Sequence, residues 1–145
     1  IFAGNSMLFE GYTGGGNKEV IDGLMSTGDV GRIDADGRLV IEGRDDEMIV
    51  SGGENVFPKE VEDCLTEHPA VAEAAAIGVE DPEFGMRLRA FVSTYGPVTE
   101  AELKDHVKSY LARFKVPREV IFLEELPRNA TGKILKRELA DWQAV

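Results

Sequence analysis

A lysine at the end of a polar loop has the setting that most strongly suggests chemistry. Lys133 closes the polar stretch 126–133 and lies, together with Lys136 and Arg137, in what we predict to be the first turns of the last helix. Cations there oppose the helix dipole, which favours Asp or Glu at a helix start. Since nothing nearby compensates, we predict a polyanion or a developing negative charge as the partner, with solvated surface lysines as the alternative.

Two further polar residues could bind a ligand but have simpler explanations. Asp29 follows Gly28, and a carboxylate in such a place can accept hydrogen bonds from two neighbouring hydroxyls, as on a ribose. Taken alone, the segment fits an Asx-type turn better. Arg44 precedes the acidic run 45–47, which is either a solvated loop, the favoured interpretation, or a ligand clamp next to a hinge.

A pair of glycines is the remaining candidate. Gly52 and Gly53 follow Ser51 at the end of a predicted strand. Adjacent glycines permit positive φ and let the backbone come close to a ligand. Their successive N–H groups could also form a concavity that binds an anion. A tight turn before a helix explains the same residues equally well.

The overall charge argues against several classes of partner. The chain has 145 residues, 43% of them hydrophobic, with 16 Lys and Arg against 27 Asp and Glu and a net charge of −11. Such acidity argues against a general nucleic-acid binder and against electrostatic adhesion to anionic lipid. No apolar run approaches the ~20 residues of a transmembrane segment. The single cysteine, Cys64, predicts a reducing, cytoplasmic setting, while peripheral attachment to a membrane stays open.

The elements that must position these residues fall into two regions. Residues 1–45 are rich in glycine and turn signals, and we predict short strands and loops, with a glycine-rich surface turn at 13–18 and a hairpin at Asp36-Gly37. From residue 46 the pattern predicts a small α+β domain with helices packed on a short sheet. The predicted order there is a strand at 48–50, a helix from Pro58, strands at 71–79 and 87–95, a helix behind a capping box of Thr99 and Glu102, a strand at 120–123 and a last helix.

Apolar periodicity identifies the buried faces of these helices. Cys64 and His68 share one face of the first helix with Val61 and Leu65. They are therefore predicted to pack in or beside the core, and no metal site is predicted in the chain. In the last helix the predicted buried residues are Ile134, Leu135, Leu139 and Trp142.

Three segments taken together resemble one known superfamily. Residues 26–29 (STGD), 43–62 (GRDDEMIVSGGENVFPKEVE) and 126–133 (LPRNATGK) are similar, in this order, to motifs in the C-terminal part of the adenylate-forming superfamily. That superfamily includes acyl-CoA synthetases, luciferases and the adenylation domains of peptide synthetases. The resemblance covers nearly the whole chain and is greatest to the fatty-acyl and aryl CoA ligases.

The resemblance implies a ligase with two steps and two domains. Such enzymes join a carboxylic acid to ATP, releasing pyrophosphate, and then transfer the acyl group from the adenylate to the thiol of coenzyme A. A large N-terminal domain holds the acyl pocket, most of the ATP site and Mg²⁺, and a small C-terminal domain changes its pose between the steps. Residues 1–45 would be the β-rich tail of the N-terminal domain, and residues 46–145 the mobile C-terminal domain.

The resemblance also implies roles for individual residues. Lys133, the catalytic residue, would contact the reacting carboxylate and the α-phosphate, and Asp46 would be the hinge. Contacts with the ribose would come from Asp29 and Arg44. The residues implied in binding coenzyme A are Ser51, Gly52 and Gly53 along the pantetheine path, and Phe114 and Arg118 near its nucleotide.

We therefore expect the C-terminal fragment of an ATP-dependent acyl-CoA synthetase, which acts on a carboxylic acid with ATP, Mg²⁺ and coenzyme A. A fatty acid is the expected substrate, with an aryl acid as the alternative. The competing hypotheses are an enzyme that passes its adenylate to a carrier protein and a non-enzymatic α+β interaction module. Because Ile1 opens the chain abruptly, we expect an N-terminal domain upstream and an inactive fragment without it.

Overall fold

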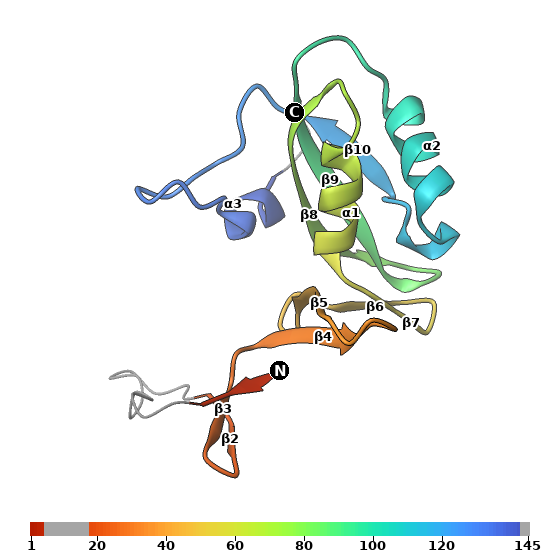
Figure 1. Ribbon diagram of the computed structural model, residues 1–145. Coiled ribbons are helices and arrows are strands. Elements are labelled where there is room, and N and C mark those ends of the chain that lie inside the picture. The colour runs from red at the N-terminus through yellow and green to blue at the C-terminus, as the bar shows by residue number, and fades with distance from the viewer. Residues whose placement is uncertain (5–17, 143–145) are drawn as a thin grey trace. The chain divides into compact units, whose positions relative to one another are not determined.

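The computed structural model describes residues 1–4 and 18–142 (Figure 1). The chain divides into two compact units, the first from Ile1 to Asp46 and the second from Glu47 to Val145. The predicted turn at 13–18 lies, apart from Lys18, outside the described residues. No helix in the described ranges is long and apolar enough to cross a membrane. That the first unit is the tail of a larger domain stays a prediction.

The first unit is built from short antiparallel strands. A three-stranded sheet consists, in order, of β1 (Phe2–Ala3), β3 (Leu24–Ser26) and β2 (Val20–Ile21), and a two-stranded sheet of β4 (Asp29–Ile33) and β5 (Leu39–Arg44).

The predicted hairpin at Asp36-Gly37 is confirmed as the connection between β4 and β5. Gly37 has a φ of 80°. The Asp34 carboxylate accepts hydrogen bonds from the backbone N–H groups of Asp36 and Arg38, both at 2.9 Å. The register set by the turn shifts by one residue between Val30 and Gly31, and beyond this irregularity Asp29 lies opposite Arg44 at the far end of the hairpin.

The second unit has the predicted α+β fold. Its described residues form one five-stranded sheet and three α-helices (Figure 1). The central strand is β9, which pairs antiparallel with β8, parallel with β10 and at one position with β6. In chain order the elements are β6 (Ile49–Ser51), β7 (Glu54–Val56), α1 (Pro58–Thr66), β8 (Val71–Asp81), β9 (Gly85–Thr94), α2 (Glu100–Tyr110), the 3₁₀-helix η1 (Arg113–Lys115), β10 (Glu119–Phe122) and α3 (Lys136–Ala140).

The core of this unit lies on both faces of the sheet. On one face, Leu88 and Ala90 of β9 pack with Cys64 and other residues of α1 and α2. On the other face, Phe91 packs with Leu139 of α3. The strand predicted at 87–95 is therefore confirmed, with buried residues on both of its faces, as is the packing of Cys64 in the core, where only 5% of the residue is exposed.

The capping box predicted for the second helix is also confirmed. The Thr99 hydroxyl accepts a hydrogen bond from the backbone N–H of Glu102, and the Glu102 carboxylate accepts one from the backbone N–H of Thr99 at 2.8 Å. Thr99→Ala is expected to lower the free energy of unfolding by about 1 kcal/mol, since it removes one of these partners. Urea denaturation followed by circular dichroism measures the change. A midpoint equal to that of the unaltered chain would contradict a stabilising role for the cap.

The last helix differs from its prediction in where it begins and in what it buries. α3 starts at Lys136, so Lys133 lies before the helix, not in its first turns. A positive φ of 84° at Gly132 and an isolated bridge between Arg128 and Ile134 close the preceding residues into a loop, which delays the helix. Trp142 lies beyond the helix end and is 40% exposed, so its predicted burial is wrong.

Candidate functional site

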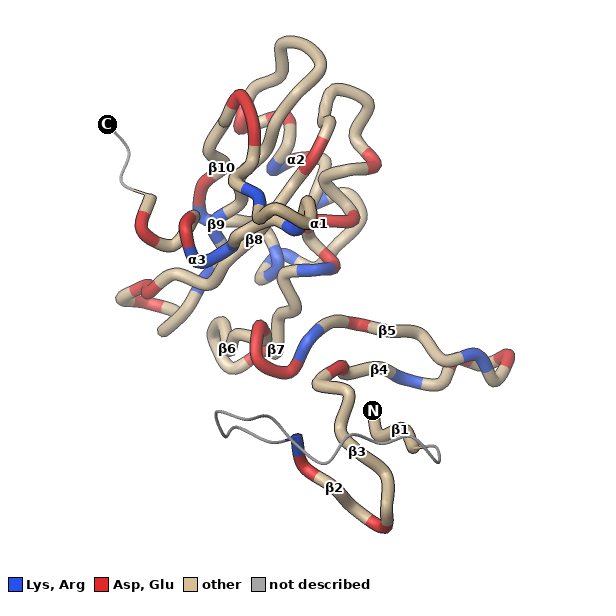
Figure 2. Tube along the Cα trace, turned by 90° about the vertical axis from the view of Figure 1, so that its left-hand side faces the viewer, with Lys and Arg blue, Asp and Glu red and all other residues tan. Residues whose placement is uncertain are grey.

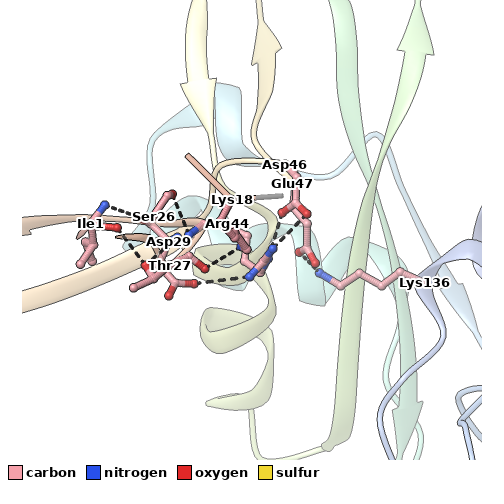
Figure 3. Close-up of polar contacts among 10 residues, drawn as sticks. Ile1, Lys18, Ser26, Thr27, Asp29, Arg44, Asp46, Glu47 and Lys136 are labelled. Atoms are coloured by element: carbon pink, nitrogen blue, oxygen red, sulfur yellow. Dashed lines mark hydrogen bonds and ion pairs between the residues drawn. The ribbon is translucent and has the colours of Figure 1, made fainter. Parts of the chain in front are cut away.

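Arg44 and Asp29 face each other at the open end of the β4–β5 hairpin (Figure 3). The Arg44 guanidinium donates two hydrogen bonds to the Asp46 carboxylate, Nε to Oδ1 at 2.9 Å and Nη2 to Oδ2 at 3.0 Å. Its third nitrogen, Nη1, lies 3.8 Å from Oδ1 of Asp29. Arg44 therefore lies between the carboxylate predicted to bind ribose and the one predicted to act as the hinge.

The ion pair keeps both of its members charged. The hydrogen bond to Asp46 raises the pKa of the Arg44 guanidinium above its ordinary value. The hydrogen bond from Arg44 lowers the pKa of Asp46 below the ordinary range of a carboxyl group. The first unit ends at Asp46, so this pair is formed by the last residues before the division of the chain.

The segment before Asp29 is a turn, but Ser26 and Thr27 supply its side-chain hydrogen bonds, and not an Asp side chain as in the predicted Asx-type turn. The hydroxyls of Ser26 and Thr27 accept hydrogen bonds from the backbone N–H groups two residues further on, at 3.2 and 3.1 Å. Gly28 has a φ of 78°, and a Cβ there would lie 2.6 Å from Nζ of Lys18. The glycine thus lets a cation lie over the turn, while the Asp29 side chain, 36% exposed, keeps an oxygen surface for a ligand.

The two glycines predicted to line a pantetheine path form a hairpin turn between β6 and β7. Gly52 and Gly53 have φ values of 58° and 89°, so both occupy the left-handed region that the favoured two-residue hairpin turns require. The Gly52 N–H donates a hydrogen bond to the Phe84 carbonyl at 2.9 Å. A Cβ on Gly52 would approach the Phe84 ring to 3.2 Å. The turn is therefore fastened to the connection between β8 and β9.

One pocket brings together residues predicted from separate motifs. Ser51 and Phe114 both line a pocket of about 420 Å³. Its other lining residues, which sequence reasoning missed, are Phe84, Arg87 and Arg113. The guanidinium carbon of Arg87 lies 5.4 Å from the centre of the Phe84 ring, within the range of a cation–π contact. Guanidinium groups beside aromatic rings can bind an anionic group and a flat ring together.

Arg118 lines a different pocket from Phe114. Its guanidinium donates a hydrogen bond to the Glu80 carbonyl at 3.3 Å and lies 3.9 Å from the Asp81 carboxylate. Hydrogen bonds from the backbone N–H groups of Phe84 and Glu83 lower the pKa of Asp81. This pocket has a volume of about 540 Å³ and is lined by Glu80, Asp81, Pro82, Gly85, Met86 and Arg118.

The loop that carries Lys133 is organised by one asparagine side chain. Oδ1 of Asn129 accepts hydrogen bonds from the N–H of Lys133 at 2.8 Å and from both the N–H and the hydroxyl of Thr131, at 3.0 and 2.7 Å. The backbone of Asn129 also bonds both Gly132 and Lys133. The Lys133 side chain is exposed, and it has no ion pair or hydrogen bond to the rest of the described chain. Its ammonium is thus presented on an ordered loop.

Lys136, unlike Lys133, is paired with carboxylates of the chain itself. This is contrary to the prediction that Lys133, Lys136 and Arg137 together offer their charges to a ligand. The Lys136 ammonium forms an ion pair with Glu47 (Figure 3) and a second one, at 2.9 Å, with Glu62. Burial alone would lower the pKa of Lys136, but the hydrogen bond to Glu47 and the charge of Glu62 outweigh it and raise the pKa above its ordinary value. No local pattern could have found this contact, since Glu47 is 89 residues from Lys136.

Comparison with known proteins identifies the family. Residues 60–133 match the family described as AMP-binding enzyme C-terminal domain. The chain belongs to this family. The matched range of this AMP-binding C-terminal domain ends at Lys133 and includes Phe114 and Arg118. The predicted membership of the adenylate-forming superfamily is thereby confirmed.

Several relatives are much longer than this chain. A 2-succinylbenzoate–CoA ligase of Bacillus cereus is 47% identical over 81% of the chain and 24% of its own length. An o-succinylbenzoate CoA synthetase of Bacillus subtilis, solved with its acyl-adenylate intermediate, superposes with a TM-score of 0.79 at 42% identity, covering 86% of the chain and 26% of its own. A fatty acyl CoA synthetase of Mycobacterium tuberculosis has a TM-score of 0.68 at 44% identity, covering 83% and 24%. The chain therefore spans about a quarter of the length of these relatives.

The relatives bear on the predicted acyl group but not on the individual residues. Their names do not single out fatty acids, since 2-succinylbenzoate, an aromatic acid, occurs in two of those described. The roles predicted for Asp29, Arg44 and Lys133 stay predictions. Among the described residues of this AMP-binding C-terminal domain, no group of three or more His, Cys, Asp or Glu side chains could hold a metal ion.

Proposed function

We propose that this chain is the C-terminal part of an ATP-dependent acid–CoA ligase, which forms an acyl-adenylate and then a thioester with coenzyme A. The observation that carries the proposal is the exposed ammonium of Lys133, held on an ordered loop in a member of the AMP-binding family. The first unit of this chain would be the tail of the N-terminal domain. The remainder of that domain would supply the acyl pocket, most of the ATP site and Mg²⁺.

Lys133 would act in the first step, in which two negative groups must meet. The oxygen of the substrate carboxylate attacks the α-phosphorus of ATP, and pyrophosphate leaves. An ammonium between the carboxylate and the α-phosphate offsets their repulsion and stabilises the charge that develops in the transition state. The hydrogen bonds of Asn129 would keep the lysine in place at no further cost in loop entropy.

Asp29 and Arg44 would bind the ribose of the nucleotide in this proposal. The exposed carboxylate of Asp29 can accept hydrogen bonds from two hydroxyls. The guanidinium beside it has two of its nitrogens bound to Asp46, which leaves Nη1 on the Asp29 side to donate to a ribose oxygen. A bound nucleotide would therefore lie next to the residue proposed as the hinge.

The second step would use the pocket lined by Ser51 and Phe114. The pantetheine arm, which is thin and uncharged, suits the open side of the glycine turn at Gly53, where no heavy atom lies within 4 Å of a Cβ position. The phosphates and the adenine of coenzyme A suit Arg87, Arg113 and the aromatic rings nearby. Thioester formation needs the thiol at the carbonyl that Lys133 contacted in the first step. A change of pose at Asp46 would meet both demands.

The acid that we propose to test first is 2-succinylbenzoate. It occurs in the names of relatives that are 42–47% identical to the chain. A fatty acid is the second candidate, because the solved fatty acyl CoA synthetase is also 44% identical. The full-length parent is expected to form the CoA thioester of 2-succinylbenzoate with a kcat/KM at least about tenfold above that for dodecanoate.

The assay follows pyrophosphate exchange and thioester formation separately for each acid. Benzoate and 4-oxo-4-phenylbutanoate serve as matched controls, because each keeps one of the two carboxylates of 2-succinylbenzoate and lacks the other. Absence of exchange with every acid would contradict the proposed ligase activity. Exchange without consumption of free coenzyme A, together with loading of a phosphopantetheinyl carrier protein, would favour the carrier-protein alternative.

A further inference from the structure

Both ends of the Lys133 loop are fastened to the same edge of the sheet. Before the loop, Arg128 forms an ion pair with Glu73 of β8 and also donates a hydrogen bond to the Gly132 carbonyl. After the loop, Lys136 forms its ion pairs with Glu62 and Glu47. Figure 2 shows basic and acidic residues side by side around α3.

The second anchor also reaches β8. Among the described strands, β8 pairs only with β9, so its other edge carries backbone groups without a strand partner. Oε1 of Glu62 accepts a hydrogen bond from the N–H of Ala76 on that edge at 2.8 Å, and the same oxygen lies 2.9 Å from the Lys136 ammonium. The Glu62 carboxylate, 14% exposed, therefore joins α1, the edge of β8 and the first residue of α3.

The first anchor has a different partner on the same strand. Glu73 precedes the buried run that begins at Ala74, and its carboxylate receives the Arg128 guanidinium. A single guanidinium thus contacts β8 and, through the Gly132 carbonyl, the backbone of the loop itself. Gly132 is the residue directly before Lys133.

We infer that Arg128 and Lys136 are positioning residues, whose ion pairs hold the loop against β8 and so aim Lys133 at the reacting carboxylate and phosphate. The inference rests on the role of Lys133 in the proposed function. The Asn129 hydrogen bonds fix the internal shape of the loop, whereas these two anchors fix its direction relative to the sheet. Without the anchors the loop would turn away from the sheet and open its internal hydrogen bonds more often, and both changes misplace the ammonium.

The test compares Arg128→Gln and Lys136→Met with a matched ion-pair variant, Arg89→Gln. Arg89 pairs with Glu119 and their side chains are 24% and 36% exposed, close to the 31% and 37% of Arg128 and Glu73. Arg89 lies on β9 and Glu119 on β10, and neither residue belongs to an anchor. In the full-length parent, both anchor variants are expected to lower kcat for pyrophosphate exchange by about 10- to 100-fold, because a misplacement of ~1 Å can cost ~100-fold. Transfer from supplied acyl-adenylate to coenzyme A should stay near wild type.

Amide hydrogen exchange in the 145-residue chain gives a readout that does not depend on activity. The N–H groups of Gly132 and Lys133 are hydrogen-bonded within the loop, and their exchange should quicken in both anchor variants and not in Arg89→Gln. The charge exchange Arg128→Glu with Glu73→Arg remakes the ion pair with β8 but not the hydrogen bond to the Gly132 carbonyl, so it should restore slow exchange and adenylation in part, and both together. This pair keeps the inference testable if a single variant folds poorly.

The outcomes separate the inference from the proposed function. Adenylation and amide exchange that match Arg89→Gln in both anchor variants would overturn the inference, even if Lys133→Ala proves severe. If Lys133→Ala leaves adenylation intact, the proposed role of Lys133 fails, and positioning fails with it. Faster loop exchange together with a selective loss of adenylation, rescued in part by the charge exchange, would support it.

Discussion

Lys133→Ala in the full-length parent is expected to lower pyrophosphate exchange by about 100- to 1000-fold, the usual loss when one group that stabilises the transition-state charge is removed. Transfer of the acyl group from supplied adenylate to coenzyme A should stay near wild type, because that step uses the other pose. The side chain is exposed, so its removal opens no cavity and leaves stability unchanged.

A second lysine provides the control for this prediction. Lys59 is also exposed, lies on α1 and pairs only with Asp63 among the described residues. Lys59→Ala removes the same charge from the same unit and should leave both half-reactions intact. Pyrophosphate exchange by Lys133→Ala that equals exchange by Lys59→Ala would remove Lys133 from the first step.

Asp46→Pro is expected to separate the two half-reactions. Proline locks φ at residue 46 and also restricts Asp45 to extended conformations. A joint that must adopt two backbone conformations would then retain only one of them. The half-reaction that needs the lost pose should slow by about 100-fold or more, as when reacting groups are held out of place.

Asp46→Ala separates the backbone effect from the loss of the ion pair. Both substitutions remove the carboxylate that binds Arg44, but alanine leaves φ free. Asp46→Ala should therefore affect both half-reactions slightly and to a similar degree. Equal loss of both steps in Asp46→Pro, with a lower melting temperature, would indicate misfolding and contradict a hinge at this residue.

The features that could be predicted from the sequence depend on neighbouring residues. The capping box of Thr99 and Glu102, the turn at Gly37 and the glycine turn at residues 52–53 are each encoded within a few positions. Their geometry follows from one side-chain bond or one positive φ. Sequence order therefore sufficed for the α+β class and for most element positions.

The features that could not be predicted depend on residues that meet only in the folded chain. Lys136 looked like an available cation because Glu47 and Glu62 are far away in sequence. The start of α3 is an exception with a local cause, since the Asn129 side chain competes for the backbone N–H groups of Thr131 and Lys133 that an earlier helix start would need. In the candidate site, Arg113 directly precedes Phe114 and could have been considered with it. No local pattern indicated that Arg87 lines the same pocket as Phe114.

The long pairing of β8 with β9 has a consequence for the order of folding. Its register runs from Asp81 opposite Gly85 to Val71 opposite Thr94. The two strands are therefore joined by one short loop at 82–84, and they can pair as soon as this loop closes. Such hairpins form in about 1–10 μs, whereas parallel pairing must wait for a longer loop to close. β10 joins β9 in parallel only after α2, and β6 meets β9 at a single position. The edge that supports the Lys133 loop is therefore expected to form early, and the pocket proposed for coenzyme A to assemble late.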